Sequence, residues 1–190
     1  MNKKRPAQSP FSAFLKMLIS PIQGWKNIKS GAHKPEEVAS RLYYPLIALI
    51  AAGEFLQLIY NPTLTVTVLL KDAVITFISF FLGYFSVLFL IELILKKDVR
   101  IKLMTDFGKN FILMNLSSMV LFYFLYEILP LAGPILVFTP IYTLYLIIKG
   151  VKYLRLPQEN YNINIFLLSI LIIGMPILIY KFFQAIMPIA

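Results

Sequence analysis

Five long apolar runs, separated by short polar gaps, dominate this chain and restrict it to folds that cross a membrane repeatedly. The runs cover residues 42–60, 73–95, 110–129, 131–148 and 163–186. A helix needs about 20 mostly apolar residues to cross the hydrocarbon core of a bilayer, and each run reaches or approaches that length. The sequence therefore predicts an all-α, polytopic membrane protein with five transmembrane helices in one bundle.

The lysines and arginines fall on alternate gaps between these runs. Of the 18 basic residues, eight precede the first run, five lie in the second gap and three in the fourth, which leaves only Lys71 and Lys181. Basic residues in short loops accumulate on the cytoplasmic side of a membrane. The pattern predicts a cytoplasmic N-terminus, a non-cytoplasmic C-terminus and, in a bacterium, insertion into the cytoplasmic (inner) membrane.

The composition excludes an ordinary soluble fold. Charged residues make up 14% of the chain, whereas soluble domains contain about 25%. The net charge of +9 is spread over the predicted cytoplasmic rim, where it attracts anionic lipid headgroups and gives no sign of nucleic-acid binding. The expected partners are the bilayer and its anionic headgroups, and the oligomeric state stays open.

The residues before the first run divide into two parts. Residues 1–9 are basic and contain proline, which predicts a disordered tail. Residues 10–41 form a cytoplasmic amphipathic segment and a polar linker, and up to Ile28 their apolar residues recur at helical spacing opposite a lysine-bearing face. Pro21 is expected to break this amphipathic helix into two pieces.

Two placements of the amphipathic segment agree with its pattern, and both can hold together. An aromatic face opposite a lysine face, directly before a span, is typical of a helix lying in the cytoplasmic headgroup layer. The other placement is packing on the cytoplasmic ends of the spans. The candidate membrane-interface residues are Phe14, Leu18, Trp25 and Lys26, with Trp25 at headgroup level. The same surface is the candidate contact for a protein partner.

A small set of polar residues lies inside the apolar runs. Hydrocarbon cannot solvate a carboxylate, so Glu54, in the middle of the first run, is expected to face the bundle interior. Gln57, Asn115 and Ser118 complete a candidate intramembrane polar site. Glu54 is either a structural residue, hydrogen-bonded to the third or fourth span, or a cation or proton site. We prefer the structural interpretation.

Two further patterns concern packing between the spans. Ser79, Gly83 and Ser86 form a stripe of small residues in the second run, which predicts that another helix approaches closely there. Residues 130–134, with the sequence PLAGP, predict a tight outer hairpin between the third and fourth spans.

No arrangement of residues in the sequence supports catalysis. The chain has no cysteine, and its single histidine, His33, lies on the polar linker without companions for a metal site of three or four ligands. The same lack of a base argues against serine hydrolysis. A non-enzymatic protein without a metal or cofactor is therefore expected.

Three segments carry a resemblance to a known family. Residues 20–28 read SPIQGWKNI, Tyr44-Pro45-Leu46 open the first span, and residues 140–151 read PIYTLYLIIKGV. Together they resemble the Yip1-domain family of five-span membrane proteins, as a prokaryotic member. The resemblance implies a five-helix bundle with a cytoplasmic N-terminus. Eukaryotic members of that family work in vesicle trafficking and contact small prenylated GTPases.

Two hypotheses for function follow from the sequence. The first is a non-enzymatic integral membrane protein that organises membrane or binds partners through its basic, amphipathic N-terminus. The alternative is a small transporter or channel for an ion or small solute, with Glu54 lining the path. The hypotheses differ in whether Glu54 borders a continuous wet cavity or lies in a dry contact between helices.

Overall fold

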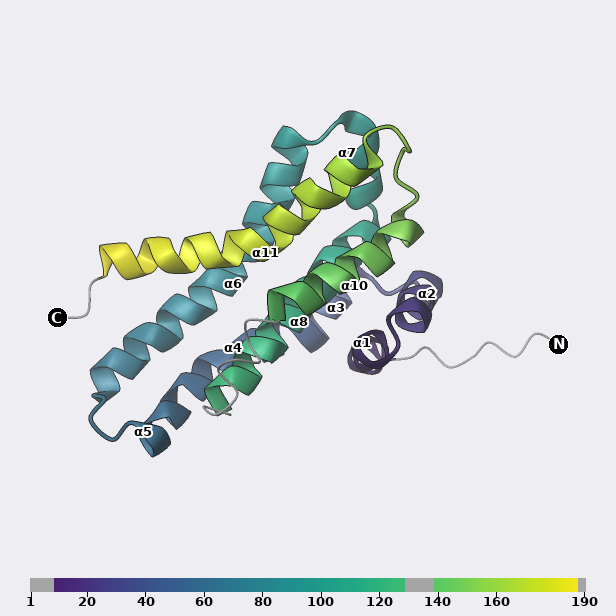
Figure 1. The fold of residues 1–190 in the computed structure, drawn as a ribbon. Helices are drawn as coiled ribbons and strands as arrows, with labels where there is room; N and C mark the ends of the chain where they lie inside the picture. The colour runs from purple at the N-terminus through teal and green to yellow at the C-terminus, as the bar shows by residue number, and fades with distance from the viewer. Residues whose placement is uncertain (1–8, 129–138, 188–190) are drawn as a thin grey trace.

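The computed structural model describes residues 9–128 and 139–187, and every secondary-structure element in these ranges is a helix (Figure 1). Four helices are long and apolar enough to cross a membrane, namely Pro35–Tyr60, Val66–Ile94, Asp106–Tyr126 and Tyr161–Ile186. The chain is thus an all-α, multi-pass membrane protein. The tail predicted for residues 1–9 lies outside the described residues apart from Ser9, and so does the predicted hairpin at residues 130–134.

The first span is assembled from five short helical segments that run on without a break. They are α3 (Pro35–Val38), the π-helical turn η1 (Ala39–Tyr43), α4 (Tyr44–Gly53), the 3-10 turn η2 (Glu54–Leu56) and α5 (Gln57–Tyr60). Pro45 has no N–H and its ring crowds the carbonyl one turn earlier, so the wide π turn directly before it accommodates the proline. The span therefore begins at Pro35, inside the segment predicted to be a polar linker.

The second span, α6 (Val66–Ile94), starts earlier than the apolar run that predicted it. The hydroxyl of Thr65 caps its N-terminus by accepting a hydrogen bond from the Val68 amide at 3.4 Å. Lys71 and Asp72, which were expected in the outer loop, consequently lie within α6, and that prediction was wrong. Charged side chains within two turns of a helix end can reach the interface while their backbone stays helical.

The remaining helices follow the predicted order with changed boundaries. The basic gap after α6 contains a short helix, α7 (Lys97–Leu103), and the third span is α8 (Asp106–Ile128). The described part of the fourth run, α10, covers Thr139–Leu154 and extends past the predicted end at residue 148. The last span is α11 (Tyr161–Ile186).

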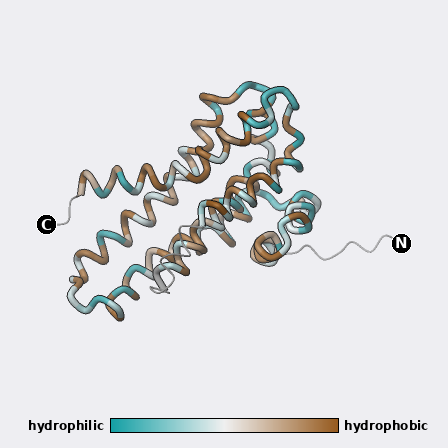
Figure 2. Tube along the Cα trace, in the orientation of Figure 1, coloured by the Kyte–Doolittle hydropathy of each residue, from teal (hydrophilic) through white to brown (hydrophobic). Residues whose placement is uncertain are grey.

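The two helices before the first span lie at one end of the bundle. Figure 1 shows α1 (Pro10–Ile19) and α2 (Pro21–Gly31) running across the direction of α8 and α10, at the same end as α7 and the turn between α10 and α11. The hydrophilic stretches gather at the turns, whereas the lengths of the long helices are hydrophobic (Figure 2). We call α1 and α2 together the cap.

The cap breaks where proline predicts it. Ser9 caps α1, since its hydroxyl accepts the Ser12 amide hydrogen bond at 3.2 Å, and α1 ends at Ile19 before Ser20. Pro21 then occupies the first position of α2, where its missing N–H leaves no intrahelical hydrogen bond unmade. Two short helices in place of one allow the chain to fold around the end of the bundle.

Helix α8 is the centre of the bundle. Every residue from position 111 to 120 is buried, so other helices surround this stretch on all sides. The outward faces of α6 and α11 instead carry exposed apolar side chains such as Phe89 and Phe166. A membrane helix that exposes large apolar side chains on one face presents that face to lipid.

The predicted close approach at the small-residue stripe is confirmed at Gly83. A Cβ atom placed on Gly83 would lie 3.0 Å from Cγ of Pro176 in α11. Proline inside a helix removes one backbone hydrogen bond and bends the helix, and Figure 1 shows α11 bent near its middle. The absence of a side chain at Gly83 gives the proline ring its space.

Gly150 of α10 provides a close contact between α10, the cap and α8. A Cβ atom there would lie 2.5 Å from Cε2 of Trp25 and 2.7 Å from Cε2 of Phe111. We expect Gly150→Ala to lower the free energy of unfolding by about 1–3 kcal/mol, because rigid aromatic rings must move to admit the methyl group. Thermal unfolding in detergent, followed by circular dichroism, measures the change.

Gly174 of α11 is the matched control for this substitution. A Cβ atom added to Gly174 would have Cγ2 of Ile170 as its nearest neighbour, at an ordinary contact distance of 3.9 Å. Gly174→Ala should leave the protein as stable as the parent or slightly more so, because alanine is the better helix former. If Gly150→Ala and Gly174→Ala were equally stable, the close contact at Gly150 would be contradicted.

Candidate functional site

Glu54 is buried inside the bundle with both carboxylate oxygens hydrogen-bonded. It is 2% exposed, and it receives the Thr76 hydroxyl on Oε1 and the Gln57 amide on Oε2, each at 2.7 Å. The 3-10 turn that begins at Glu54 explains the second contact, because residues three apart are eclipsed in a 3-10 helix. The predicted interior orientation of Glu54 is confirmed.

The four predicted polar residues form two clusters instead of one site. Glu54 and Gln57 meet Thr76 of the second span. Asn115 and Ser118 are tied within α8: the Asn115 amide donates to the Phe111 carbonyl at 2.8 Å, and the Ser118 hydroxyl donates to the Asn115 carbonyl at 2.7 Å. The second cluster reaches α10 through the Ser118 and Thr143 hydroxyls, which lie 3.3 Å apart.

A cavity of about 430 Å³ lies beside the Glu54 cluster. Residues of α6, α8, α10 and α11 line it, among them Thr76, Ser79, Tyr123, Tyr126, Pro176 and Tyr180. Thr76 belongs both to the cavity wall and to the Glu54 cluster, whereas Glu54 is not among the described lining residues. Aromatic and aliphatic carbon forms most of the wall, which suits an apolar group better than a hydrated ion.

The cap is fastened to α10 by four side-chain hydrogen bonds to backbone carbonyls. The Trp25 indole donates to Leu146 at 3.0 Å, and Tyr142 donates its hydroxyl hydrogen to Leu18. Tyr153 of α10 contributes the other two: its hydroxyl donates to Ile22 at 3.0 Å, and its carbonyl accepts from Lys29 at 2.5 Å. The cap is therefore part of the folded bundle.

The structure corrects the predicted membrane-interface residues. The side chains of Phe14 and Trp25 are both completely buried in the protein core, and Trp25 packs against Phe111. Leu18 is half-buried against the same core, and only Lys26 of the four is exposed. The placement of the segment on the ends of the spans therefore holds for Phe14 and Trp25, and neither side chain is available to lipid.

A different row of cap residues is exposed. It consists of Phe11, Leu15, Ile19 and Ile22, which recur at intervals of three and four residues along α1 and the start of α2. Ile19 is 85% and Ile22 is 60% exposed. We call this row the exposed stripe. The sequence contained the signal for it, because these residues share the apolar face of the segment with Phe14 and Trp25.

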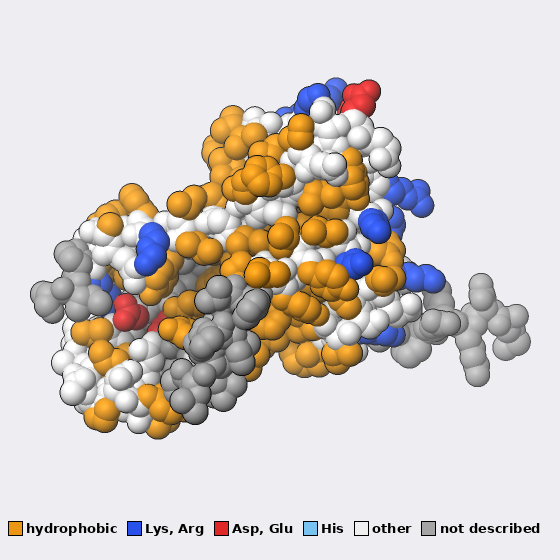
Figure 3. Space-filling view, viewed as in Figure 1, with side chains coloured by type: hydrophobic (Ala, Val, Ile, Leu, Met, Phe, Trp, Pro, Cys, Tyr) orange, Lys and Arg blue, Asp and Glu red, His pale blue; other side chains and the backbone are white. Residues whose placement is uncertain are grey.

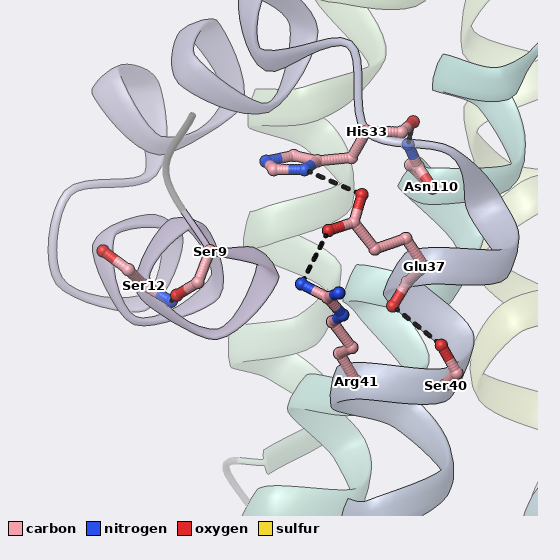
Figure 4. Close-up of polar contacts among 7 residues, drawn as sticks. All are labelled: Ser9, Ser12, His33, Glu37, Ser40, Arg41 and Asn110. Atoms are coloured by element: carbon pink, nitrogen blue, oxygen red, sulfur yellow. Dashed lines mark hydrogen bonds and ion pairs between the residues drawn. The ribbon is translucent and has the colours of Figure 1, made fainter. Parts of the chain in front are cut away.

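His33 connects the cap to the first span and to α8 (Figure 4). Its ring is buried, with Nδ1 3.7 Å from Oε2 of Glu37, while Arg41 Nη1 lies 3.2 Å from the other oxygen of Glu37. The Asn110 amide donates to the His33 carbonyl at 2.7 Å. The single histidine of the sequence thus contributes to the contacts that hold the cap, the first span and α8 together.

Comparison with family models, with curated proteins and with solved structures finds no significant match to this chain. Among the described residues, no three His, Asp or Glu side chains come together as the ligands of a metal ion would. The cap and the Glu54 cluster are consequently the features from which a function can be argued.

Replacement of Glu54 tests whether its cluster is structural. Glu54→Gln keeps a hydrogen-bonding side chain of the same shape and should leave thermal stability in detergent nearly unchanged. Glu54→Leu leaves the Thr76 hydroxyl without its acceptor and should lower the free energy of unfolding by about 1 kcal/mol.

Thr76→Val sharpens the test, because it removes the donor of the same hydrogen bond. The double variant Glu54→Leu/Thr76→Val should lose less stability than the sum of the two single losses, since both changes delete one shared contact. A leucine variant as stable as the parent, or strictly additive losses, would rule out the structural coupling between the two spans.

Proposed function

We propose that this chain is a non-enzymatic, five-span membrane protein that organises the membrane around it through its N-terminal cap. In this proposal the cap lies in the cytoplasmic leaflet, and the C-terminus lies on the opposite side. The exposed stripe carries the proposal, because it presents a row of large apolar side chains at the end of the bundle where the cap crosses the spans. The resemblance to Yip1-domain proteins favours the same topology.

The energetics favour insertion of the stripe into the leaflet. Removing one large apolar side chain from water contributes about 1.5–3 kcal/mol, so four such residues supply several kcal/mol. The hydrogen bonds to α10 already hold the cap beside the membrane, so little further freedom is lost when it inserts. Exposed lysines such as Lys26 then meet the headgroups. A helix pair inserted in one leaflet expands that leaflet and favours curvature.

Two observations support five spans. The described part of α10 has 16 residues, and the apolar run in the sequence that predicts this span begins before it, at residue 131. Helix α1 and the last turn of α11 lie at opposite ends of the bundle (Figure 1), as an odd number of crossings requires. The excess of basic residues on alternate gaps favours a cytoplasmic location for the cap.

The transport alternative finds less support in the geometry. A path for an ion needs polar groups that replace its hydration shell along a continuous route. Glu54 instead receives hydrogen bonds from Thr76 and Gln57 in a buried contact, and the neighbouring cavity has mainly apolar walls. Proteoliposomes provide the direct comparison: transport through Glu54 would be abolished by Glu54→Gln, whereas a structural Glu54 predicts that the parent and the variant show the same flux or none.

Reporter fusions test the topology. A phosphatase that is active only outside the cytoplasm should be active when it is fused after Ala190, and inactive when it is fused after Arg155. The expected difference follows from the positive-inside rule applied to the turn that contains Arg155. An inactive fusion after Ala190 would mean an even number of spans and would overturn the proposed arrangement.

Charged substitutions in the exposed stripe test the membrane role. We expect the full-length protein to reduce the mean diameter of proteoliposomes in electron micrographs, and Phe11→Asp/Ile19→Asp to abolish this effect. Both side chains are exposed, so the folded protein tolerates the change, whereas the carboxylates oppose insertion into hydrocarbon.

Gln23→Asp/Ser30→Asp is the matched control, because it adds the same charge at exposed positions outside the stripe. The control should remodel vesicles as the parent does. If the stripe variant remodels vesicles as well as the control, the cap does not act as a membrane wedge.

A further inference from the structure

At the edge of the cap, Lys29 lies beside the segments that carry two other cations, Lys102 and Arg155. Lys29 comes from the end of α2, Lys102 from α7, and Arg155 from the turn after α10. The Nζ of Lys29 contacts the carbonyl of Tyr153, two residues before Arg155, and the ring of Phe107, in the helix that follows α7. Figure 3 shows that Lys and Arg side chains gather at this end of the molecule.

The backbone at Arg155 is unusual for an arginine. Its φ of 54° lies in the left-handed region, where glycine or asparagine ordinarily ends a helix because a Cβ atom is disfavoured. Arg155 therefore occupies a position where the backbone conformation favours glycine or asparagine.

No described carboxylate forms an ion pair with any of the three residues. Both ion pairs of the described residues involve Glu37, and neither Lys102 nor Arg155 has a described carboxylate within 4.0 Å. The pKa of Lys29 is lowered from its usual value, first by partial burial and then by the charges of Arg155 and Lys102. An anion placed among these groups would relieve the repulsion between them.

We propose that Lys29, Lys102 and Arg155 form a binding site for the phosphate of an anionic phospholipid headgroup. The planar guanidinium group of arginine and the ammonium group of lysine are the usual protein ligands of phosphate. Ile101 and Ile163, on the elements that flank the site, are 52% and 56% exposed and provide apolar surface for a lipid tail. A headgroup bound at this site would fix the cap at the membrane surface. The inference rests on the proposed function, which places the cap on the cytoplasmic side.

A titration of the full-length protein in neutral detergent micelles tests the site. Dioctanoyl phosphatidic acid is the probe, with dioctanoyl phosphatidylcholine and glycerol 3-phosphate as comparisons, and thermophoresis gives the Kd. We expect the phosphatidic acid to bind more tightly than either comparison, and raised salt to weaken it. Lys102→Gln/Arg155→Gln should weaken binding roughly 30-fold, on the basis of about 1 kcal/mol for each basic residue.

Lys34→Gln/Lys97→Gln is the matched control, since it removes the same charge from exposed residues at the same end of the bundle. The control should bind like the parent. Equal weakening in both double variants would mean diffuse attraction and would overturn the site. Equal binding of phosphatidylcholine would do the same, and glycerol 3-phosphate binding as tightly as the lipid would show a site for soluble phosphate instead.

Arg155→Gly separates the anion site from a purely structural role. Glycine relieves the left-handed backbone, so the melting temperature should stay the same or rise while affinity for phosphatidic acid falls. Unchanged affinity in this variant would remove Arg155 from the site. Because these titrations need no insertion of the exposed stripe, their failure is distinguishable from failure of the membrane-wedge function.

Discussion

The hydrogen bond from the Trp25 indole to the Leu146 carbonyl is the contact on which the arrangement of the cap depends. A helix carbonyl is normally covered by the side chain one turn further on, because helical side chains lean toward the N-terminus. One turn after Leu146 the residue is Gly150, which has no side chain, so the indole can approach α10 closely and reach the oxygen. One glycine thereby permits two short N-terminal helices to join a membrane bundle and sets which of their faces turns outward.

The polar side chains within the spans face the interior of the bundle. Glu54 finds Thr76 on the second span, while Asn115 and Ser118 bond within α8 and reach Thr143. Each contact satisfies a group that hydrocarbon would leave unsolvated. On the face that Figure 3 shows, hydrophobic side chains cover the middle of the bundle, and most Lys and Arg side chains lie at the end where the cap is. A bilayer with anionic headgroups favours this distribution.

The sequence predicted the features that follow from hydrocarbon solvation and missed those that depend on packing. Four of the predicted spans, the break at Pro21 and the inward direction of Glu54 are confirmed, because apolar length, a missing N–H and a costly carboxylate act locally. The roles of Phe14 and Trp25 were assigned to the wrong surroundings, since protein core and lipid are equally apolar and hydropathy cannot distinguish them. Thr76 carried no signal because threonine is common in spans. Lys71 and Asp72 were placed outside the second span because the apolar run that predicted this span begins only at residue 73.

The depth of the exposed stripe in the bilayer tests the central claim most directly. The chain has no cysteine, so Ile19→Cys and Lys26→Cys each give a single site for a spin label in proteoliposomes. Electron paramagnetic resonance then compares collisions with oxygen, which concentrates in hydrocarbon, and with a water-soluble nickel complex. The account predicts that the label at position 19 collides mainly with oxygen and the label at position 26 mainly with nickel. A label at position 19 as accessible to nickel as the one at position 26 would contradict it.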